Sequence, residues 1–460
     1  MNKDKPEKKD YRVINVPYEF KNRSSESADL DGQPNVRTDE GRVNGGANLP
    51  EKRQKKPMKK NVGKRVKSEK NGKTPPSGEK NDKKISVIIG GKLKRAAKFK
   101  KLLAAAAVLL TAFIVLNIAI PIGLIDATGE FFAGFSASGP GFPLDISAAS
   151  GRLISGVGSD VALLCDSTVM LYTSSGKQIY NRPHGFSNPA AATSRYRVLV
   201  YDRGGKGYKI ERRRGTVLEG SADREIITAA IGDKGFFALA TRSGDYVCDV
   251  TAFDRKGGQK CTWHSSERQV VALAVSDDGR YMGIGTVSGQ GGKTLGGVLL
   301  IKTDGGTIIS DQSFEGSNVV SLDFKGNTLV GVFDNMLTSI TEQGVRTDFG
   351  FDSGRVSCFA QSSTAVAVTV EKYNDSANNQ LMVFDKTLEN LYSADIGAEA
   401  VSLSLSGNKA VVLSGEKLIS FDAKGERKKE AEASADARQI ITSGAGTAVL
   451  GSVTIESGKV

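Results

Sequence analysis

Residues that could carry out chemistry are scarce in this chain. Its 460 residues include two histidines, four cysteines and one tryptophan. His184 lies in an Arg-Pro-His-Gly turn and His264 follows Trp263, and neither has another ligand type at a metal-binding spacing. The chain also lacks a Gly-x-Ser-x-Gly nucleophile elbow. We therefore expect no catalytic residue, no metal site and no cofactor.

The segment Gly291-Gly292-Lys293-Thr294 resembles the end of a phosphate-binding loop. Such a loop requires a glycine five positions before Gly292, where this chain has Val287. It also requires a strand followed by a helix, whereas this segment lies between two predicted strands. We interpret it as a flexible loop between strands.

The cysteines divide into two pairs. Cys165 and Cys358 lie in apolar segments far apart in the chain, so we expect both to be small buried residues. Cys248 and Cys261 flank one predicted hairpin, but they are not placed symmetrically about its turn at residues 254–258. A disulfide between them is an alternative that this spacing does not favour.

Two groups of residues are candidates for binding. A basic group is a candidate anion site, with solvated strand edges as the alternative: Arg203, Lys206, Lys209, Arg212, Arg213 and Arg214. A β-prone apolar group near the N-terminus is a candidate docking motif for a partner's sheet edge or groove, with a chance cluster as the alternative. Its members are Tyr11, Val13, Ile14, Val16, Tyr18 and Phe20.

The net charge of +12 is unevenly distributed. Residues 1–101 contain 29 Lys and Arg against 13 Asp and Glu, whereas the rest of the chain contains 34 against 38. The basic excess begins at residue 51, in a segment with few large apolar side chains. Such a composition does not bury enough surface to fold, so residues 1–101 are predicted to be a disordered tail. The tail lacks the aromatic interleaving that favours nucleic-acid binding, so we do not expect a nucleic-acid partner.

Residues 102–125 form an uncharged run that predicts a transmembrane helix. Twenty-four residues would extend about 36 Å as a helix, enough to cross a hydrocarbon core of about 30 Å. The run is too long and begins too far into the chain for a cleaved signal peptide. Lys and Arg precede it and Asp126 and Glu130 follow it, so we expect the N-terminus in the cytoplasm and the remaining chain outside. The lysines nearest the membrane would contact anionic lipids of the inner leaflet.

The remainder of the chain is predicted to be all-β and repetitive. Short runs of Val, Leu, Ile, Ala and Phe alternate with Gly, Asp, Ser and Asn clusters. A turn between the third and fourth strands of each unit recurs at intervals averaging about 40 residues, the length of a four-stranded propeller blade. These turns are predicted near Ser174, Arg213, Asp254, Thr303, Thr341, Lys386 and Asp422.

The two ends of this region predict how a ring would close. After the seventh unit the last residues supply about three strands, and residues 141–147 supply one more. Together they would complete an eighth blade, so we expect eight blades, with seven blades or a pair of β-sandwiches as alternatives. The predicted domains are the tail at 1–101, the membrane helix at 102–125, a linker at 126–140 and the β-propeller at 141–460.

The clearest unit carries a resemblance to known propellers. Its strand-turn-strand pattern is similar to the motif of YVTN, WD40-like and quinoprotein-like propellers: Val271, Ala272, Ala274, Ser276, Asp278, Gly279 and Gly283. With the preceding segments, the chain resembles an uncharacterised bacterial family of single-pass membrane proteins with an external propeller. The resemblance implies a fold and a location. The chain is similar to quinone-dependent enzymes only in the plan of its ring, because it has one Trp and no two adjacent cysteines.

The expected function is a non-enzymatic binding or scaffold module, anchored in the cell membrane, for a protein, peptide or envelope ligand. The alternative is a transmembrane coupler that links an external ligand to a cytoplasmic partner through residues 11–20. A quinoprotein-like enzyme remains as a residual alternative.

Overall fold

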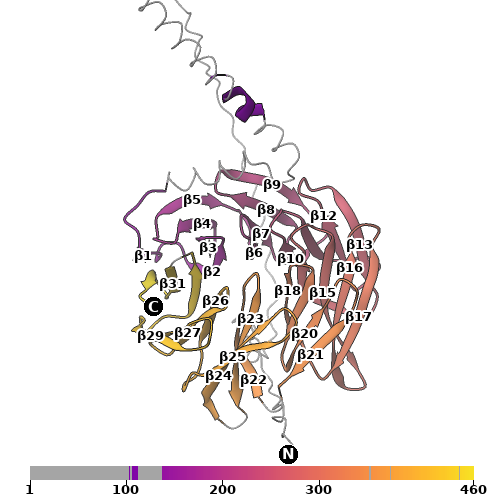
Figure 1. Cartoon of the computed structure of the whole chain (residues 1–460). Coiled ribbons are helices and arrows are strands. Elements are labelled where there is room, and N and C mark those ends of the chain that lie inside the picture. Colours follow the sequence, from indigo (N-terminus) through magenta and orange to yellow (C-terminus); the bar gives the residue numbers. More distant parts are fainter. Residues whose placement is uncertain (1–102, 104–105, 112–136, 352–353, 373–374, 445) are drawn as a thin grey trace, which may run out of the picture. The chain divides into compact units, whose positions relative to one another are not determined.

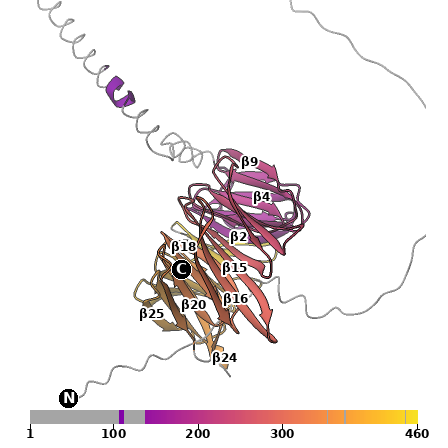
Figure 2. The ribbon, with the colours of Figure 1, turned by 90° about the vertical axis from the view of Figure 1, so that its right-hand side faces the viewer.

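Eight four-stranded antiparallel sheets make up the chain between residue 144 and residue 458 (Figures 1 and 2). The computed structural model describes residues 103, 106–111, 137–351, 354–372, 375–444 and 446–460. The predicted eight-bladed β-propeller is confirmed, and the seven-bladed and sandwich alternatives are wrong. First strands of most neighbouring sheets contact one another. We therefore letter the strands of a blade A to D, from the axis outward.

The first four blades follow chain order without interruption. Blade 1 contains β2 (Gly151–Val157), β3 (Asp160–Cys165), β4 (Thr168–Thr173) and β5 (Gln178–Pro183). Blade 2 contains β6 (Pro189–Thr193), β7 (Val198–Asp202), β8 (Gly207–Arg212) and β9 (Gly215–Ser221). Blade 3 contains β10 (Ile226–Ile231), β11 (Phe237–Arg242), β12 (Cys248–Phe253) and β13 (Gln259–Ser265). Blade 4 contains β14 (Gln269–Val275), β15 (Tyr281–Gln290), β16 (Lys293–Lys302) and β17 (Thr307–Glu315).

The next three blades repeat the plan, and the eighth joins both ends. Blade 5 contains β18 (Val319–Lys325), β19 (Thr328–Phe333), β20 (Met336–Ile340) and β21 (Arg346–Gly350). Blade 6 contains β22 (Gly354–Gln361), β23 (Ala365–Lys372), β24 (Asp375–Asp385) and β25 (Asn390–Asp395). Blade 7 contains β26 (Ser402–Ser406), β27 (Lys409–Ser414), β28 (Lys417–Phe421) and β29 (Arg427–Glu432). Blade 8 contains β30 (Gln439–Ser443), β31 (Gly446–Leu450), β32 (Thr454–Gly458) and β1 (Leu144–Asp145).

The hydrophobic core is divided among the contacts between blades. Eight clusters of buried side chains each combine residues from two consecutive blades, including blades 7 and 8 and blades 8 and 1. Strands B and C are therefore covered on both faces, which explains why β3 is buried along its whole length. A strand covered on both faces reads as a continuous apolar run, as the sequence does here.

Side chains of the C–D turns set the hairpin geometry. Asp254, Asp385 and Asp422 each accept hydrogen bonds from the backbone N–H groups two and four residues later. Thr173 and Thr341 accept from the N–H four residues later in their own turns. Such local bonds compete with extension of the strand and favour a turn. All seven predicted C–D turns are confirmed.

The ring closes as the sequence predicts. Leu144 pairs with Ile455 and Asp145 with Thr454, so the first strand is the outer strand of the last blade. On the axial side, the Gln439 side chain donates to the Ile154 carbonyl and accepts from the Ile154 N–H, both at 3.0 Å. These bonds join blade 8 to blade 1, because Ile154 lies on β2.

A strap of residues just before β1 reinforces the same seam. Ser138 and Gln178 exchange two backbone hydrogen bonds, and the Phe142 N–H donates to the Ser175 carbonyl at 3.1 Å. The strap therefore contacts blade 1 before β1 joins blade 8. Part of the predicted linker, residues 137–140, thus belongs to the ring.

Turns emerge on two faces of the ring. We call the face with the A–B and C–D turns the A–B face, and the opposite face, with the B–C turns and the links between blades, the B–C face. Successive turns of an antiparallel sheet alternate between its two ends, so every blade contributes two turns to the A–B face.

The predicted tail and most of the predicted membrane helix lie outside the described residues. Leu103 and residues 106–111 are helical. Among the residues that the structure describes, none of the helices is both long enough and apolar enough to span a membrane.

The seam gives a test of the closed ring. Ile455 is fully buried in the cluster shared by blades 8 and 1. Ile455→Ala should lower the free energy of unfolding by about 2–5 kcal/mol, because it leaves a cavity at that contact. Urea unfolding of the full chain measures this. Val453→Ala, half-exposed in the preceding turn, should change it by less than about 0.5 kcal/mol, and equal losses for both variants would contradict the closure.

Candidate functional site

His184 is a buried structural residue. Its Nδ1 accepts from the Phe186 N–H at 3.1 Å, and its Nε2 lies 3.2 Å from the Cys165 carbonyl. These partners fit the neutral ring with its proton on Nε2. Burial lowers the pKa of His184, so the ring favours this neutral form. Both ring nitrogens are occupied within the fold.

His264 lies on the outer strand of blade 3 and is exposed. Its Nδ1 is 2.7 Å from Asp249 Oδ1, and its ring stacks on Tyr246 at a centroid distance of 4.8 Å. Sequence spacing did not indicate this carboxylate, because Asp249 is brought opposite His264 by the β12–β13 register. Within the described residues, no group of three His, Cys, Asp or Glu side chains could hold a metal ion.

The glycine-rich segment and the cysteines have structural roles. Gly291 and Gly292 form the tight turn between β15 and β16, and the pairing continues to Gln290 and Lys293. The segment is thus a hairpin end, more ordered than the expected loop. Cys248 pairs with Ser265 and Cys261 with Ala252, so the two thiols lie four pairs apart along one ladder. None of the four cysteines is part of a disulfide in the structure.

The basic group is divided between two faces. Arg203 and Lys206 lie at the β7–β8 turn on the B–C face, whereas Arg213 and Arg214 lie at the β8–β9 turn on the A–B face. Strand β8 separates them by about 17–20 Å at its usual rise. Lys209 lies between them on β8 and pairs with Glu219 at 3.2 Å.

Arg213 is held by a buried ion pair. Its Nε and Nη2 donate to Asp160 at 2.5 and 2.6 Å, and Asp160 is 3% exposed. Nearby, Arg182 donates to Glu211 and to the Arg212 and Arg213 carbonyls. These contacts join blades 1 and 2. The anion site stays a prediction for the exposed members, which are Arg203, Lys206 and Arg214. The docking motif at residues 11–20 lies outside the described residues.

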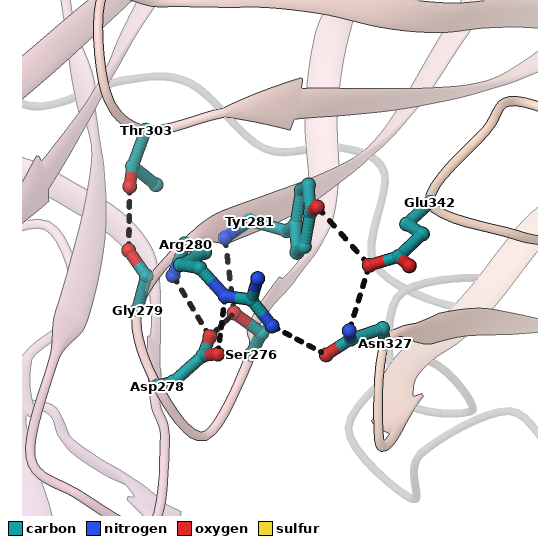
Figure 3. Close-up of polar contacts among 8 residues, drawn as sticks. All are labelled: Ser276, Asp278, Gly279, Arg280, Tyr281, Thr303, Asn327 and Glu342. Atoms are coloured by element: carbon teal, nitrogen blue, oxygen red, sulfur yellow. Dashed lines mark hydrogen bonds and ion pairs between the residues drawn. The ribbon is translucent and has the colours of Figure 1, made fainter.

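A second interlocked surface joins blades 4 and 5 on the A–B face (Figure 3). It combines four turns, at residues 276–280 and 303–306 of blade 4 and residues 326–327 and 341–345 of blade 5. Within blade 4, the Thr303 hydroxyl donates to the Gly279 carbonyl at 2.5 Å and joins its two turns. We call these four turns the blade 4–5 surface.

Glu342 is the acceptor at the centre of this surface. The Tyr281 hydroxyl and the Asn327 amide both donate to Glu342 Oε2, at 3.1 and 2.7 Å, and both point toward it in Figure 3. The Gln343 amide donates to Oε1 at 3.2 Å. Three neutral donors from three turns or strands therefore fix the carboxylate in place.

Arg280 forms the other half of the network. Its Nε donates to Asp278 Oδ2 at 2.5 Å, and its Nη2 lies 3.5 Å from Asn327 Oδ1. Asp278 also accepts from the Ser276 hydroxyl and the Arg280 N–H. Burial opposes the charge of Asp278, but these hydrogen bonds outweigh it and lower the pKa of this carboxyl. Arg280 is thus paired, and more than half of its side chain remains exposed.

Two aliphatic side chains are exposed at the outer end of this surface. Val345 is 61% and Ile308 49% exposed. Their neighbours Gly344 and Ile309 touch, because a Cβ on Gly344 would lie 3.1 Å from the Ile309 carbonyl oxygen. Ile309 thus packs on the cluster shared by blades 4 and 5, whereas Ile308 pairs with Ile301, whose side chain belongs to the cluster shared by blades 3 and 4.

This surface could not be identified from the sequence. The Asp278-Gly279 turn was recognised, but Glu342 and Asn327 come from the next blade. A weak signal existed in Ile308-Ile309, where two adjacent apolar residues on an outer strand break the alternation and leave one side chain in solvent.

The lowered pKa of His184 predicts acid sensitivity. Unfolded histidine binds a proton near pH 6.5, whereas folded His184 does so at lower pH. Stability is therefore complete above about pH 6.5 and falls as the pH drops toward the folded pKa. In His184→Gln an amide that does not titrate replaces the ring, so its free energy of unfolding should fall less between pH 7 and pH 5 than that of the parent protein. Urea titration at each pH measures this. His264→Gln is the control, and an unchanged slope in His184→Gln would contradict the assignment.

Adjacent arginines provide a test of the divided basic group. Arg213→Ala should lower the free energy of unfolding by about 3–5 kcal/mol, because it leaves the buried Asp160 without its counter-charge. Arg214→Ala, at the exposed neighbouring position, should change it by about 0.5 kcal/mol or less. Thermal and urea unfolding measure both variants. Similar small effects for the two would show that Arg213 is not structural.

Comparison with known proteins supports the fold. A family model described as "Family of unknown function (DUF5711)" matches residues 154–454. A search of the curated proteins found no match. The computationally designed Ika8 protein has a TM-score of 0.50 at 13% identity, over 68% of this chain and 96% of that chain. The C-terminal WD40 domain of Sif2 has a TM-score of 0.50 at 13% identity, over 70% and 98%.

BamB from Moraxella catarrhalis is also similar, with a TM-score of 0.45 at 12% identity, over 69% of this chain and 96% of that chain. The first two structures share the propeller fold with this chain. The expected likeness to an uncharacterised family with a propeller is confirmed. Because the matched residues span more than half of the chain, the protein belongs to the family of unknown function DUF5711.

Proposed function

We propose that this protein is a membrane-anchored, non-enzymatic β-propeller that binds a protein partner outside the cytoplasm. The observation that carries the proposal is the blade 4–5 surface, where Ile308 and Val345 are exposed beside an interlocked set of polar side chains. Burying two aliphatic side chains supplies a driving force of about 25 cal/mol for each Å² of apolar area removed from water.

The frame around these side chains favours binding. Four turns are joined by side-chain hydrogen bonds between Thr303 and Gly279, Tyr281 and Glu342, and Asn327 and Glu342. A surface that is already ordered loses little conformational entropy when a partner binds, so more of the contact energy appears as affinity. Propellers present many turns on one rigid ring, and function tends to lie in such segments.

Charge distribution supports the proposed location. The uncharged residues 102–125 separate a tail with a large excess of Lys and Arg from a slightly acidic ring. The positive-inside rule then favours a cytoplasmic tail and an external propeller. The non-enzymatic assignment is supported by His184, whose two ring nitrogens are engaged within the fold.

A cysteine variant tests the surface and the location together. In cells expressing a variant with its four native cysteines replaced by serine or alanine, Val345→Cys should react with a membrane-impermeant maleimide that carries a photo-crosslinker. Illumination of intact cells should then give a discrete crosslinked species, because the attached crosslinker lies within reach of the partner when it binds this surface. Immunoblotting after electrophoresis measures both the labelling and the crosslink.

Val453→Cys is the matched control on the B–C face, where Val453 is also half-exposed. It should be labelled to the same extent without the same crosslinked species. Labelling of Val345→Cys only after cell lysis would contradict the location. Labelling in intact cells with no crosslink would contradict the use of this surface.

A further inference from the structure

The blade 4–5 surface carries an excess of carboxylates. Together with the neighbouring A–B turn of blade 3, residues 232–236, its four turns contain five acidic and two basic side chains. The acidic members are Asp233, Asp277, Asp278, Asp304 and Glu342, and the basic members are Lys234 and Arg280. Arg280 is already paired with Asp278. Arg346, directly after the last of these turns, is paired with Asp348, and Lys302 directly precedes the turn at 303–306, so carboxylates still outnumber the cations left for a partner.

Part of the negative charge lies toward the axis. Asp277 lies in the A–B turn of blade 4, and its side chain accepts from the Asp233 N–H of blade 3 at 3.3 Å. Partial burial, then the nearby Asp233 carboxylate, raise the pKa of Asp277. The Asp233 part of this shift arises because the two carboxylates lie near each other. The Asp323 carboxylate on β18 is already paired with the buried Lys325.

Glu342 extends this charge outward to the aliphatic pair. Its carboxylate accepts only from neutral donors among the described residues, namely Tyr281, Asn327 and Gln343. Glu342 and Val345 share one C–D turn, and Ile308 lies at the start of the neighbouring β17. A–B turns are nearer the axis than C–D turns, because they join the two inner strands. The surface thus carries carboxylates in both its A–B and its C–D turns, and its exposed aliphatic side chains lie at the C–D side.

We propose that the partner presents one segment in which Lys or Arg side chains stand beside aliphatic residues, with the cations against these carboxylates and an aliphatic residue against Val345. This inference rests on the proposed function and adds the chemistry of the partner. Charge complementarity selects the cation, because a carboxylate held by neutral donors is left to pair with an incoming guanidinium or ammonium group. An acidic partner would face repulsion from Asp277, Asp304 and Glu342.

Selection from a peptide library tests this chemistry. Full-length protein in detergent micelles is immobilised and used to select from a phage-displayed library of random 12-residue peptides. Selected sequences should be enriched in Lys or Arg adjacent to Leu, Ile or Val. The most enriched peptide is then synthesised with a fluorophore, and its dissociation constant is measured by fluorescence anisotropy.

Three variants locate the binding. Glu342→Gln keeps a hydrogen-bond acceptor for Tyr281 and Asn327 but removes the charge, and it should weaken peptide binding by about tenfold or more. Val345→Ser should weaken binding by about fivefold or more through the lost aliphatic contact. Glu426→Gln, in the equivalent C–D turn of blade 7, is the matched control and should bind within about twofold of the parent protein.

The outcomes separate this inference from the proposed function. Enrichment of acidic peptides, or wild-type affinity in Glu342→Gln, would overturn the inference, and the crosslink at Val345→Cys would then still support a protein partner. A missing crosslink together with the selected basic-aliphatic peptides would contradict the cellular role while supporting the chemistry of the surface. Failure of both experiments would overturn both proposals.

Discussion

Each blade depends on its neighbours for the burial of its faces, and this constraint governs the whole ring. A four-stranded sheet of this composition has apolar side chains on both faces, and one sheet alone would expose them to water. The eight buried clusters each lie between two consecutive blades. The ring therefore has to close, and closure requires the short strand β1 on β32 together with the Gln439 contacts to Ile154.

Close approach of the blades requires small residues at defined places. A Cβ on Gly296 would lie 2.4 Å from the Ser317 carbonyl oxygen, so β16 approaches the link between blades 4 and 5 only because residue 296 is glycine. Where the blades meet at the A–B face, polar side chains replace apolar ones, as in Arg213 with Asp160 and Tyr281 with Glu342. The same tight contact that buries the core thus also orders the turns that a partner would meet.

Sequence reasoning predicts well what is local. Positions of the C–D turns follow from Asp254, Asp385 and Asp422, because the carboxylates bond to backbone groups within four residues. Closure also followed from a strand count at the two ends. Contacts between blades could not be predicted, since Tyr281 and Glu342 are 61 positions apart. The basic group was predicted as one site because its residues are close in sequence. The length of β8 instead places them on two faces of the ring.

The seam between the chain ends has a consequence for the order of folding during synthesis. Residues 144 and 145 leave the ribosome before any complete blade, yet their partners Ile455 and Thr454 are made almost last. Blades 1 to 7 can stack as they appear, but the outer face of blade 1 and the strap before it stay uncovered until synthesis ends. Translation time and chaperone protection of that face should therefore limit the yield of closed rings more than the stability of any single blade.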